Sequence, residues 1–231
     1  MKRLFLFLVA ALAMLNVMAE NYPTKFLGIP IDGSREEMIR KIQEKGYTYD
    51  QEHDCLIGQF NGSDVHVFVG ANKGKVWRVM VSETTTFSEG EILIRFNNLL
   101  RQFQKNKKYI PLNGKDYRLS SDEDISYEMA VHNKIYSAEF LQIAQEVDSV
   151  WLDSTLIESM QMAGKSTGVD LNLDSLRAED RESMLKLMRE YFYLTVFEKN
   201  KVWFVIHSFY GKYHLTIYYD NGYNQADGED L

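Results

Sequence analysis

The sequence of 231 residues contains a single cysteine and only three prolines. Cys55 has no partner for an internal disulfide, so packing alone must hold the fold together. This residue begins the strand-like run CLIGQF, which predicts a buried small apolar side chain rather than a reactive thiol. The chain also has 14 tyrosines and 13 phenylalanines, and this aromatic content with so little proline argues against disorder.

Motifs of familiar catalytic and nucleotide sites are scarce as well. The sequence contains neither H-E-x-x-H nor C-x-x-C, the spacings of a zinc protease and of a dithiol redox enzyme. Gly164-Lys-Ser-Thr167 resembles the end of a phosphate loop, but Ser159 stands where that loop requires its first glycine. We interpret Gly164 as the end of a helix, and we expect no nucleotide and no other cofactor.

Long apolar runs are missing beyond the first twenty residues. Residues 4–15 are apolar, follow two basic residues and precede the small-residue site Val17-Met-Ala19. This order is typical of a secretory signal peptide. The run of about 12 residues is too short for a membrane-spanning helix, which needs about 20. We therefore expect a signal peptide at residues 1–19, a periplasmic or extracellular location, and no transmembrane segment in the mature chain.

Positive charge is in deficit. The chain has 26 lysines and arginines against 33 acidic residues, a formal net charge of −7. Such a protein repels phosphate backbones and anionic bilayers. We therefore expect neither nucleic acid nor an anionic membrane surface as its partner.

One structural pattern is present and begins near residue 26. Residues 34–45 open with the capping box Ser34-Arg-Glu-Glu37 and place apolar residues on one helical face. Three β-type runs follow, at residues 55–60, 63–70 and 75–82. The Asn61-Gly62 pair between the first two is a strong hairpin signal. A helix followed by an antiparallel meander is expected to pack its apolar face on one side of the sheet.

The same pattern begins again at residue 88. Ser88-Glu-Gly-Glu91 is a second capping box, and a longer helix follows it to about residue 108. We interpret four later runs as the strands of a second meander: 125–132, 135–143, 201–207 and 213–219. Residues 145–199 interrupt this meander with helical spacing, which is typical of an insertion.

These patterns predict an α+β fold of two tandem units, each a helix with an antiparallel meander. The first unit is expected at residues 20–87 and the second at residues 88–231. The second unit carries the helical insertion at residues 145–199.

Short runs at both ends of the mature chain carry a family resemblance. Gly28-Ile-Pro-Ile-Asp-Gly33, before a helix ending in Lys45-Gly-Tyr47, resembles the start of a group of small exported bacterial proteins. Val202-Trp-Phe204, Tyr210-Gly-Lys-Tyr213 and Tyr218-Tyr-Asp-Asn221 resemble the end of the same group. The resemblance implies a β-lactamase-inhibitor-protein-like arrangement of tandem α/β units. It implies a fold and brings no catalytic residues.

Histidines and acidic clusters give weaker signals. His207 and His214 flank the last hairpin turn, but a metal between them needs a third ligand, such as Asp220 or Glu139. An ordinary pair of histidines is the preferred interpretation. The acidic stretches at 122–124 and 220–230 do not fit the spacing of a calcium loop. We expect solvated acidic loops there, and no metal site.

Aromatic residues give the remaining functional signal. If the valines of residues 65–69 face the helices, then a second set of side chains faces the other way: Phe68, Arg78, Trp203, His214 and Tyr218. An antiparallel sheet can leave one face open. The alternative is that the inserted helices or a second copy of the chain cover this face.

Two functions follow from these observations. The leading hypothesis is an exported, non-catalytic binding module that recognises a protein, peptide or envelope component through the aromatic side of the sheet, because Tyr, Trp and Arg are enriched at interface hot spots. The alternative is a secreted hydrolase with an unrecognised carboxylate or histidine site.

Overall fold

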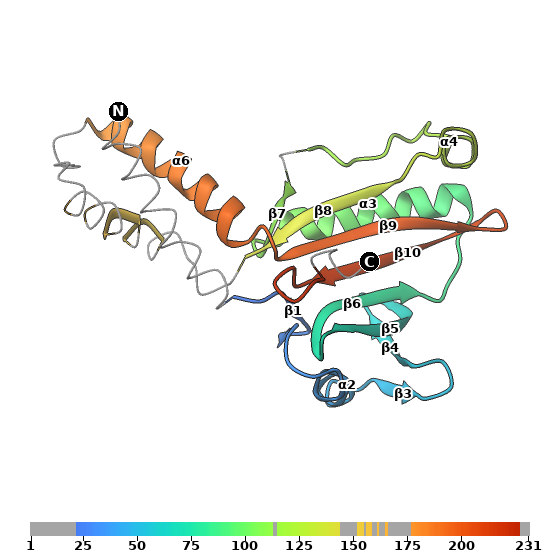
Figure 1. Ribbon diagram of the computed structural model, residues 1–231. Helices are drawn as coiled ribbons and strands as arrows, with labels where there is room; N and C mark the ends of the chain where they lie inside the picture. Colours follow the sequence, from blue (N-terminus) through green and yellow to red (C-terminus); the bar gives the residue numbers. More distant parts are fainter. Residues whose placement is uncertain are drawn as a thin grey trace. The chain divides into compact units, whose positions relative to one another are not determined.

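The computed structural model describes residues 22–112, 115–143, 152–154, 156–158, 161, 165 and 177–226 (Figure 1). Its internal contacts divide the chain into two compact units. The larger unit comprises Pro23–Gln142 and Lys199–Leu231, and the smaller one comprises Met1–Tyr22 and Ile143–Glu198. The predicted signal peptide at residues 1–19 lies outside the described residues.

One eight-stranded antiparallel sheet is the centre of the larger unit, with the order β3-β4-β5-β6-β10-β9-β8-β7 (Figure 1). The strands are β3 (Thr48–Asp50), β4 (Cys55–Phe60), β5 (Ser63–Asn72), β6 (Lys75–Glu83), β7 (Tyr109–Pro111), β8 (Ser137–Gln142), β9 (Lys201–Phe209) and β10 (Lys212–Asp220). A separate two-stranded sheet pairs β1 (Lys25–Phe26) with β2 (Ile29–Pro30). The predicted α+β class with antiparallel meanders is confirmed.

The two meanders are halves of this single sheet. Strands β3 to β6 follow one another on one side, and β7 to β10 follow one another on the other. The last strands of the two meanders join the halves of the sheet, because β6 pairs antiparallel with β10 from Arg78–Asp220 to Ser82–Thr216. Each half therefore contributes one helix and four strands to a shared core.

The first helix, α2 (Arg35–Gln43), forms where its capping box predicts it. The Ser34 hydroxyl accepts a hydrogen bond from the backbone N–H of Glu37 at 3.2 Å. Met38, Ile39 and Ile42 are buried on its inner face and belong to the core. The helix contacts β3, β4, β5 and β6.

The second helix, α3 (Glu89–Lys105), packs on the other half of the sheet. The Glu91 carboxylate accepts the backbone N–H of Ser88 at 2.8 Å, which closes the capping box at its start. Phe96 lies 5.0 Å from Phe204 of β9, measured between ring centroids, and Phe103 lies 4.9 Å from Phe140 of β8. These aromatic contacts fix α3 on the sheet face that α2 also covers.

The region after α3 differs from its prediction. Residues 125–132 form a helix, α4 (Ile125–His132), rather than a strand. Asp124 caps it by accepting from the backbone N–H of Tyr127 at 2.8 Å, and it ends at Asn133 in the left-handed conformation. The alternation of apolar and polar residues misled the prediction, because only Ile125 is buried. The first strand of the second meander is instead β7, which pairs with β8.

The turn between β4 and β5 is the predicted hairpin. Asn61 and Gly62 both have positive φ, at 52° and 76°, and Phe60 pairs directly with Ser63. The strand before the turn needs Gly58, because a side chain there would overlap the ring of Tyr47. The Tyr47 hydroxyl donates to the carbonyl of Gln59 at 2.8 Å and holds the ring in that place.

The smaller unit is described mainly through α6 (Ala178–Val196), which lies within the helical insertion expected at residues 145–199. Leu152, Leu156, Phe192 and Phe197 are buried. Arg189 of α6 binds the Asp153 carboxylate through two hydrogen bonds of 2.6 and 2.9 Å. Gly164, which was expected to end a helix, lies outside the described residues.

Two further expectations concern Cys55 and membrane-spanning helices. Cys55 is a free and buried thiol, as its position in an apolar strand predicted. No helix among the described residues combines the length and the apolar character needed to cross a bilayer.

Candidate functional site

The strand register shows which side chains lie on each face of the sheet. Val67, Val81, Ile217 and Phe204 stand opposite one another on four neighbouring strands, and all four are buried beneath the helices. Their sequence neighbours form the parallel row Phe68, Met80, Tyr218 and Trp203. Because successive side chains of a strand alternate, this second row lies on the face away from the helices. All four of its members are partly exposed.

The centre of this face is an ion pair between Arg78 of β6 and Asp220 of β10. Two hydrogen bonds join them, Nε to Oδ1 at 2.6 Å and Nη2 to Oδ2 at 2.8 Å. The indole Nε1 of Trp203 donates to the same Oδ2 at 2.9 Å. The Asp220 side chain is only 10% exposed, and these three charge-assisted bonds offset the cost of burying its charge.

Aromatic rings surround the Arg78 guanidinium. Its carbon lies 4.2 Å from the ring centroid of Trp77, 4.9 Å from that of Tyr218 and 5.6 Å from that of Trp203. Tyr218 and Trp203 stack with centroids 4.1 Å apart and planes inclined by 9°. We call the set Phe68, Trp77, Arg78, Trp203, His214 and Tyr218 the aromatic face.

Trp77 is the member that sequence reasoning missed. Strict alternation along β6 places it with Val79 and Val81 on the helix side. The register shifts between Gly70 and Ala71, and this irregularity changes the alternation at Trp77. The indole Nε1 lies 3.5 Å from the position that a Cβ of Gly70 would take. A glycine inside a strand pattern was the available signal for such a bulge.

His214 and His207 are cross-strand neighbours on β10 and β9. Their rings stack with centroids 5.3 Å apart, and the Tyr218 hydroxyl lies 3.4 Å from Nε2 of His207. Burial lowers the pKa of both imidazoles below 6.5, and His214 lowers the pKa of His207 further. Glu83 partly opposes the lowering of the pKa of His214. Both rings are therefore expected to be neutral at neutral pH.

Both candidate third ligands for a metal at this histidine pair are bound to other side chains. Asp220 is engaged by Arg78 and Trp203, and Glu139 pairs with Lys201 at 2.6 Å. Across the described part of the chain, no three or more His, Cys, Asp or Glu side chains converge in a way that could hold a metal ion. The geometry of the pair is that of two packed aromatic rings on a sheet surface.

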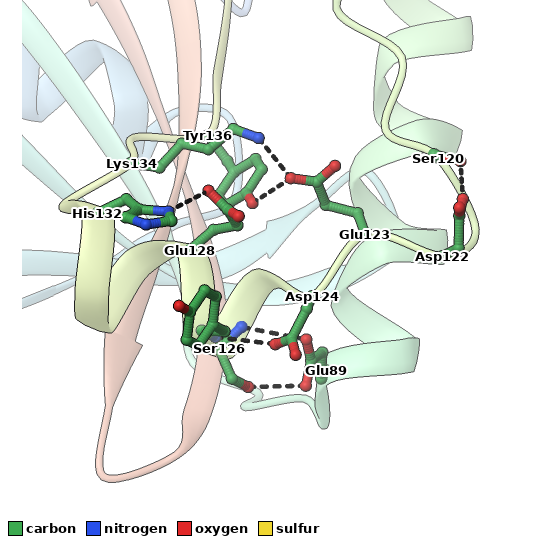
Figure 2. A network of polar contacts seen from close by, with 11 residues as sticks. Glu89, Ser120, Asp122, Glu123, Asp124, Ser126, Glu128, His132, Lys134 and Tyr136 are labelled. Atoms are coloured by element: carbon green, nitrogen blue, oxygen red, sulfur yellow. Dashed lines mark hydrogen bonds and ion pairs between the residues drawn. The ribbon is translucent and has the colours of Figure 1, made fainter.

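The acidic stretch at 122–124 belongs to a structural network around α4 (Figure 2). Figure 2 shows the Glu123 carboxylate between Lys134 and Tyr136, both of which donate to it. Burial and Glu123 together raise the pKa of the Tyr136 phenol well above its usual value. Glu89 of α3 accepts from the backbone N–H and the hydroxyl of Ser126, at 3.1 and 2.7 Å. The Glu89 carboxylate therefore links α3 to α4. The Glu123 carboxylate links the segment before α4 to Lys134 and Tyr136 after it.

Two cavities of the larger unit lie away from the aromatic face. One of about 270 Å³ is lined mainly by apolar residues, among them Phe60, Leu99, Phe103 and Tyr219. The other, of about 490 Å³, lies between α3 and the segment after β7. Neither lining contains a histidine or a pair of carboxylates. They therefore lack the groups that a carboxylate or histidine hydrolase would use.

Residues 164–168 also match the pattern of a nucleophilic serine. Gly164-Lys-Ser-Thr-Gly168 fits the G-x-S-x-G pattern of a nucleophilic serine. That motif has meaning only on a tight turn between a strand and a helix. Ser166 and both glycines lie outside the described residues.

No family model, curated protein or solved structure matches this chain.

Proposed function

We propose that this protein is an exported, non-catalytic binding module that recognises a protein or peptide, free or as part of the cell envelope, through its aromatic face. The observation that carries the proposal is the environment of Arg78. The guanidinium is bound to Asp220, lies beside three aromatic rings, and keeps 27% of its side chain exposed.

This cluster has the properties of an interface anchor. Trp, Tyr and Arg dominate the binding energy of protein interfaces when they occupy the centre of a contact. Their rotamers are already fixed here, since Trp203 is bonded to Asp220 and stacked on Tyr218. Binding therefore costs less side-chain entropy than it would with mobile residues. Phe68 and Met80 extend the same apolar row toward β5.

The test is capture of the partner by purified protein and by two variants, Trp203→Ala and Tyr218→Ala. The bait is immobilised and incubated with solubilised envelope from the producing cell. We expect each variant to lose about tenfold or more in affinity, because interface hot spots are worth at least about 2 kcal/mol. The matched control is Tyr127→Ala, which removes an exposed aromatic of α4. Capture that survives both substitutions, in variants with native circular dichroism, contradicts the proposal.

A secreted hydrolase is the second candidate, and the G-x-S-x-G run at residues 164–168 is the observation in its favour. It predicts turnover of an activated ester such as p-nitrophenyl acetate by the purified protein. Ser166→Ala must then abolish that turnover, while Ser120→Ala, a serine outside the motif, leaves it unchanged. Turnover that is equal in wild type and Ser166→Ala removes this candidate.

We further propose that the chain shares the β-lactamase-inhibitor-protein-like arrangement that its terminal runs resemble. Two features support this: the capped helices α2 and α3, and the four-strand meander that follows each of them. An experimental structure of the larger unit tests it directly. Strands β6 and β10 must then pair as the two central strands of one sheet.

A further inference from the structure

One segment reverses the charge of an otherwise acidic protein. Residues 97–118 contain six cationic side chains and a single carboxylate, although the whole chain carries a net charge of −7. The cations are Arg101, Lys105, Lys107, Lys108, Lys115 and Arg118. Such a concentration of one sign creates a local positive potential that attracts anions.

Three of these cations line the cavity of about 490 Å³ beside α3. Arg101 comes from the helix, and Lys115 and Arg118 come from the segment after β7. The amide side chains of Asn97 and Gln104 and the apolar Leu100 and Pro111 also contribute to the lining. We call this the cationic pocket. Its volume is within the range of small-molecule sites, about 300–1,000 Å³.

The cations of the pocket form no ion pairs among the described residues, and they outnumber the one carboxylate of the lining, that of Asp116. Elsewhere arginines hold carboxylates, as Arg35 holds Asp54 and Arg95 holds Glu83. Within the described part of the chain, no carboxylate forms an ion pair with Arg101, Lys115 or Arg118. Among the described residues, Arg101 donates to the neutral side chain of Asn98, and the Nζ of Lys115 lies 5.6 Å from the ring centroid of Tyr117. Their charge is therefore available to a ligand.

The loop that carries two of the cations is anchored. The side chain of Asn97 accepts from the backbone N–H of Leu119 at 3.0 Å and donates to its carbonyl at 2.9 Å. The ring of Tyr117 is buried, and its hydroxyl donates to the carbonyl of Leu112 at 3.2 Å. The one acidic side chain of the lining, Asp116, accepts from the backbone N–H of Arg118 at 3.0 Å. These contacts fix the backbone from which Arg118 and its charge extend.

We propose that the cationic pocket binds a phosphate monoester, either free or as the headgroup of a lipid. Guanidinium groups bind phosphate oxygens through two parallel hydrogen bonds, and Lys115 adds a compact positive charge. A phosphate dianion matches three unpaired cations better than a single carboxylate does. Leu100 and Pro111 give an apolar surface for the group that carries the phosphate. The acidic remainder of the protein repels anions and confines binding to this place.

This inference is independent of the aromatic face, because α3 covers the opposite side of the sheet. It also refines the expectation from net charge. A protein with a net charge of −7 binds a long polyanion poorly. A single phosphate, however, experiences only the charges within about a Debye length, roughly 8 Å.

The experiment titrates the full-length mature protein with glycerol phosphate and with glycerol, by calorimetry at low ionic strength. A parallel arm uses phosphatidylcholine vesicles with and without phosphatidic acid. We expect saturable binding of glycerol phosphate or of the phosphatidic acid vesicles, none of glycerol, and weakening by added salt. Arg101→Gln and Arg118→Gln should each weaken the binding about tenfold or more, as expected for lost charge-assisted bonds.

Three controls accompany the titration. Lys105→Gln removes a cation from the same helix outside the pocket lining, and it should change the affinity by less than about twofold. Circular dichroism shows whether the pocket variants are folded, and Arg118→Lys, which keeps the charge, should retain part of the affinity. Binding of soluble phosphate alone identifies a free ligand, and binding of vesicles alone identifies a lipid headgroup. The inference is overturned if neither ligand binds, or if Lys105→Gln weakens binding as much as Arg101→Gln does.

Discussion

At the scale of single residues, the pairing of Arg78 with Asp220 decides how the aromatic face is built. The carboxylate orients the guanidinium and the Trp203 indole together, so two residues from β6 and β9 depend on one from β10. Buried ion pairs of this kind contribute little net stability when compared with apolar residues. Their role here is to fix the positions of the rings that a partner would contact.

Asp220→Leu is the substitution that isolates this role. It leaves Arg78 partly buried without its carboxylate, and we expect a loss of about 2 kcal/mol in the free energy of unfolding, measured with urea. The loss is smaller than for a fully buried pair, because water still reaches the guanidinium. The double variant Arg78→Met, Asp220→Leu should recover part of it. Equal stability of the single and double variants would show that the pair is not coupled.

The stacked histidines predict a pH dependence. In the folded protein the pKa of His207 and that of His214 lie below 6.5, so the unfolded chain binds protons first as the pH falls. Their contribution to stability is therefore complete above about pH 6.5 and is lost as the pH falls below it. The measurement compares the free energy of unfolding of wild type and of His207→Gln, His214→Gln across this range. An identical slope in both proteins contradicts the lowered pKa values.

At the scale of elements, the two halves of the sheet begin with the same kind of capped helix but continue differently. Both principal helices begin after an N-cap serine, but the half of the sheet that follows α3 contains an additional helix, α4, between β7 and β8, where β3 leads directly to β4 in the first half. The Asp124 cap and the left-handed Asn133 terminate α4 at both ends. Local capping therefore overrides an alternating pattern when the segment is only eight residues long.

Asp124→Ala tests whether this segment is a helix. Loss of the N-cap should lower the free energy of unfolding by about 1 kcal/mol and speed hydrogen exchange at the first amides of α4. Asp122→Ala is the matched control, because Asp122 is exposed and its carboxylate accepts from the side chain of Ser120 rather than from an amide of α4. If residues 125–132 formed a strand, the two substitutions would have equal and small effects.

Glycine positions give a second test of the elements. Gly58→Ala forces a methyl group against the Tyr47 ring, and we expect destabilisation of about 1–3 kcal/mol. Gly90→Ala, at an open position in the first turn of α3, should instead stabilise by up to about 1 kcal/mol. Thermal unfolding of the two variants should move the midpoint in opposite directions. A shift of the same sign in both would contradict the described packing of β4.

Much of this architecture could be predicted from the sequence, where local signals are strong. Capping boxes located α2 and α3, and Asn61-Gly62 located the first hairpin with its register. Strand β7 was not recognised because three residues that include Pro111 carry almost no pattern. Trp77 was missed because it is the extra residue at a register shift between β5 and β6, which alternation along β6 alone does not reveal.

At the scale of the whole molecule, the information absent from the sequence pattern was the pairing of β6 with β10. These strands are separated by more than a hundred residues, and no local signal reports a contact at such a distance. The same pairing places Arg78 beside Asp220 and thereby creates the aromatic face. A site made by long-range pairing can be proposed from alternation, but its central ion pair becomes visible only in three dimensions.

The division of the chain predicts that the larger unit is autonomous. The backbone N–H of Gln142 donates to the carbonyl of Asn200 at 2.9 Å, so the two ends of this unit are already adjacent. Replacing residues 143–198 by a short Gly/Ser linker should therefore give a folded protein with cooperative urea unfolding. Strand-rich circular dichroism and one sharp transition are the expected result. An aggregated or non-cooperative product would contradict autonomy.

The central claim is that the aromatic face is where a partner binds, and a photo-crosslinker at position 68 tests it most directly. p-Benzoylphenylalanine in place of Phe68, irradiated in the producing cell, should give a discrete covalent adduct. The same group in place of the exposed Ile94 of α3 should give none. We predict that the adduct from position 68 disappears when Trp203→Ala and Tyr218→Ala are added. An adduct that persists in that background, or one that forms equally from position 94, would contradict the claim.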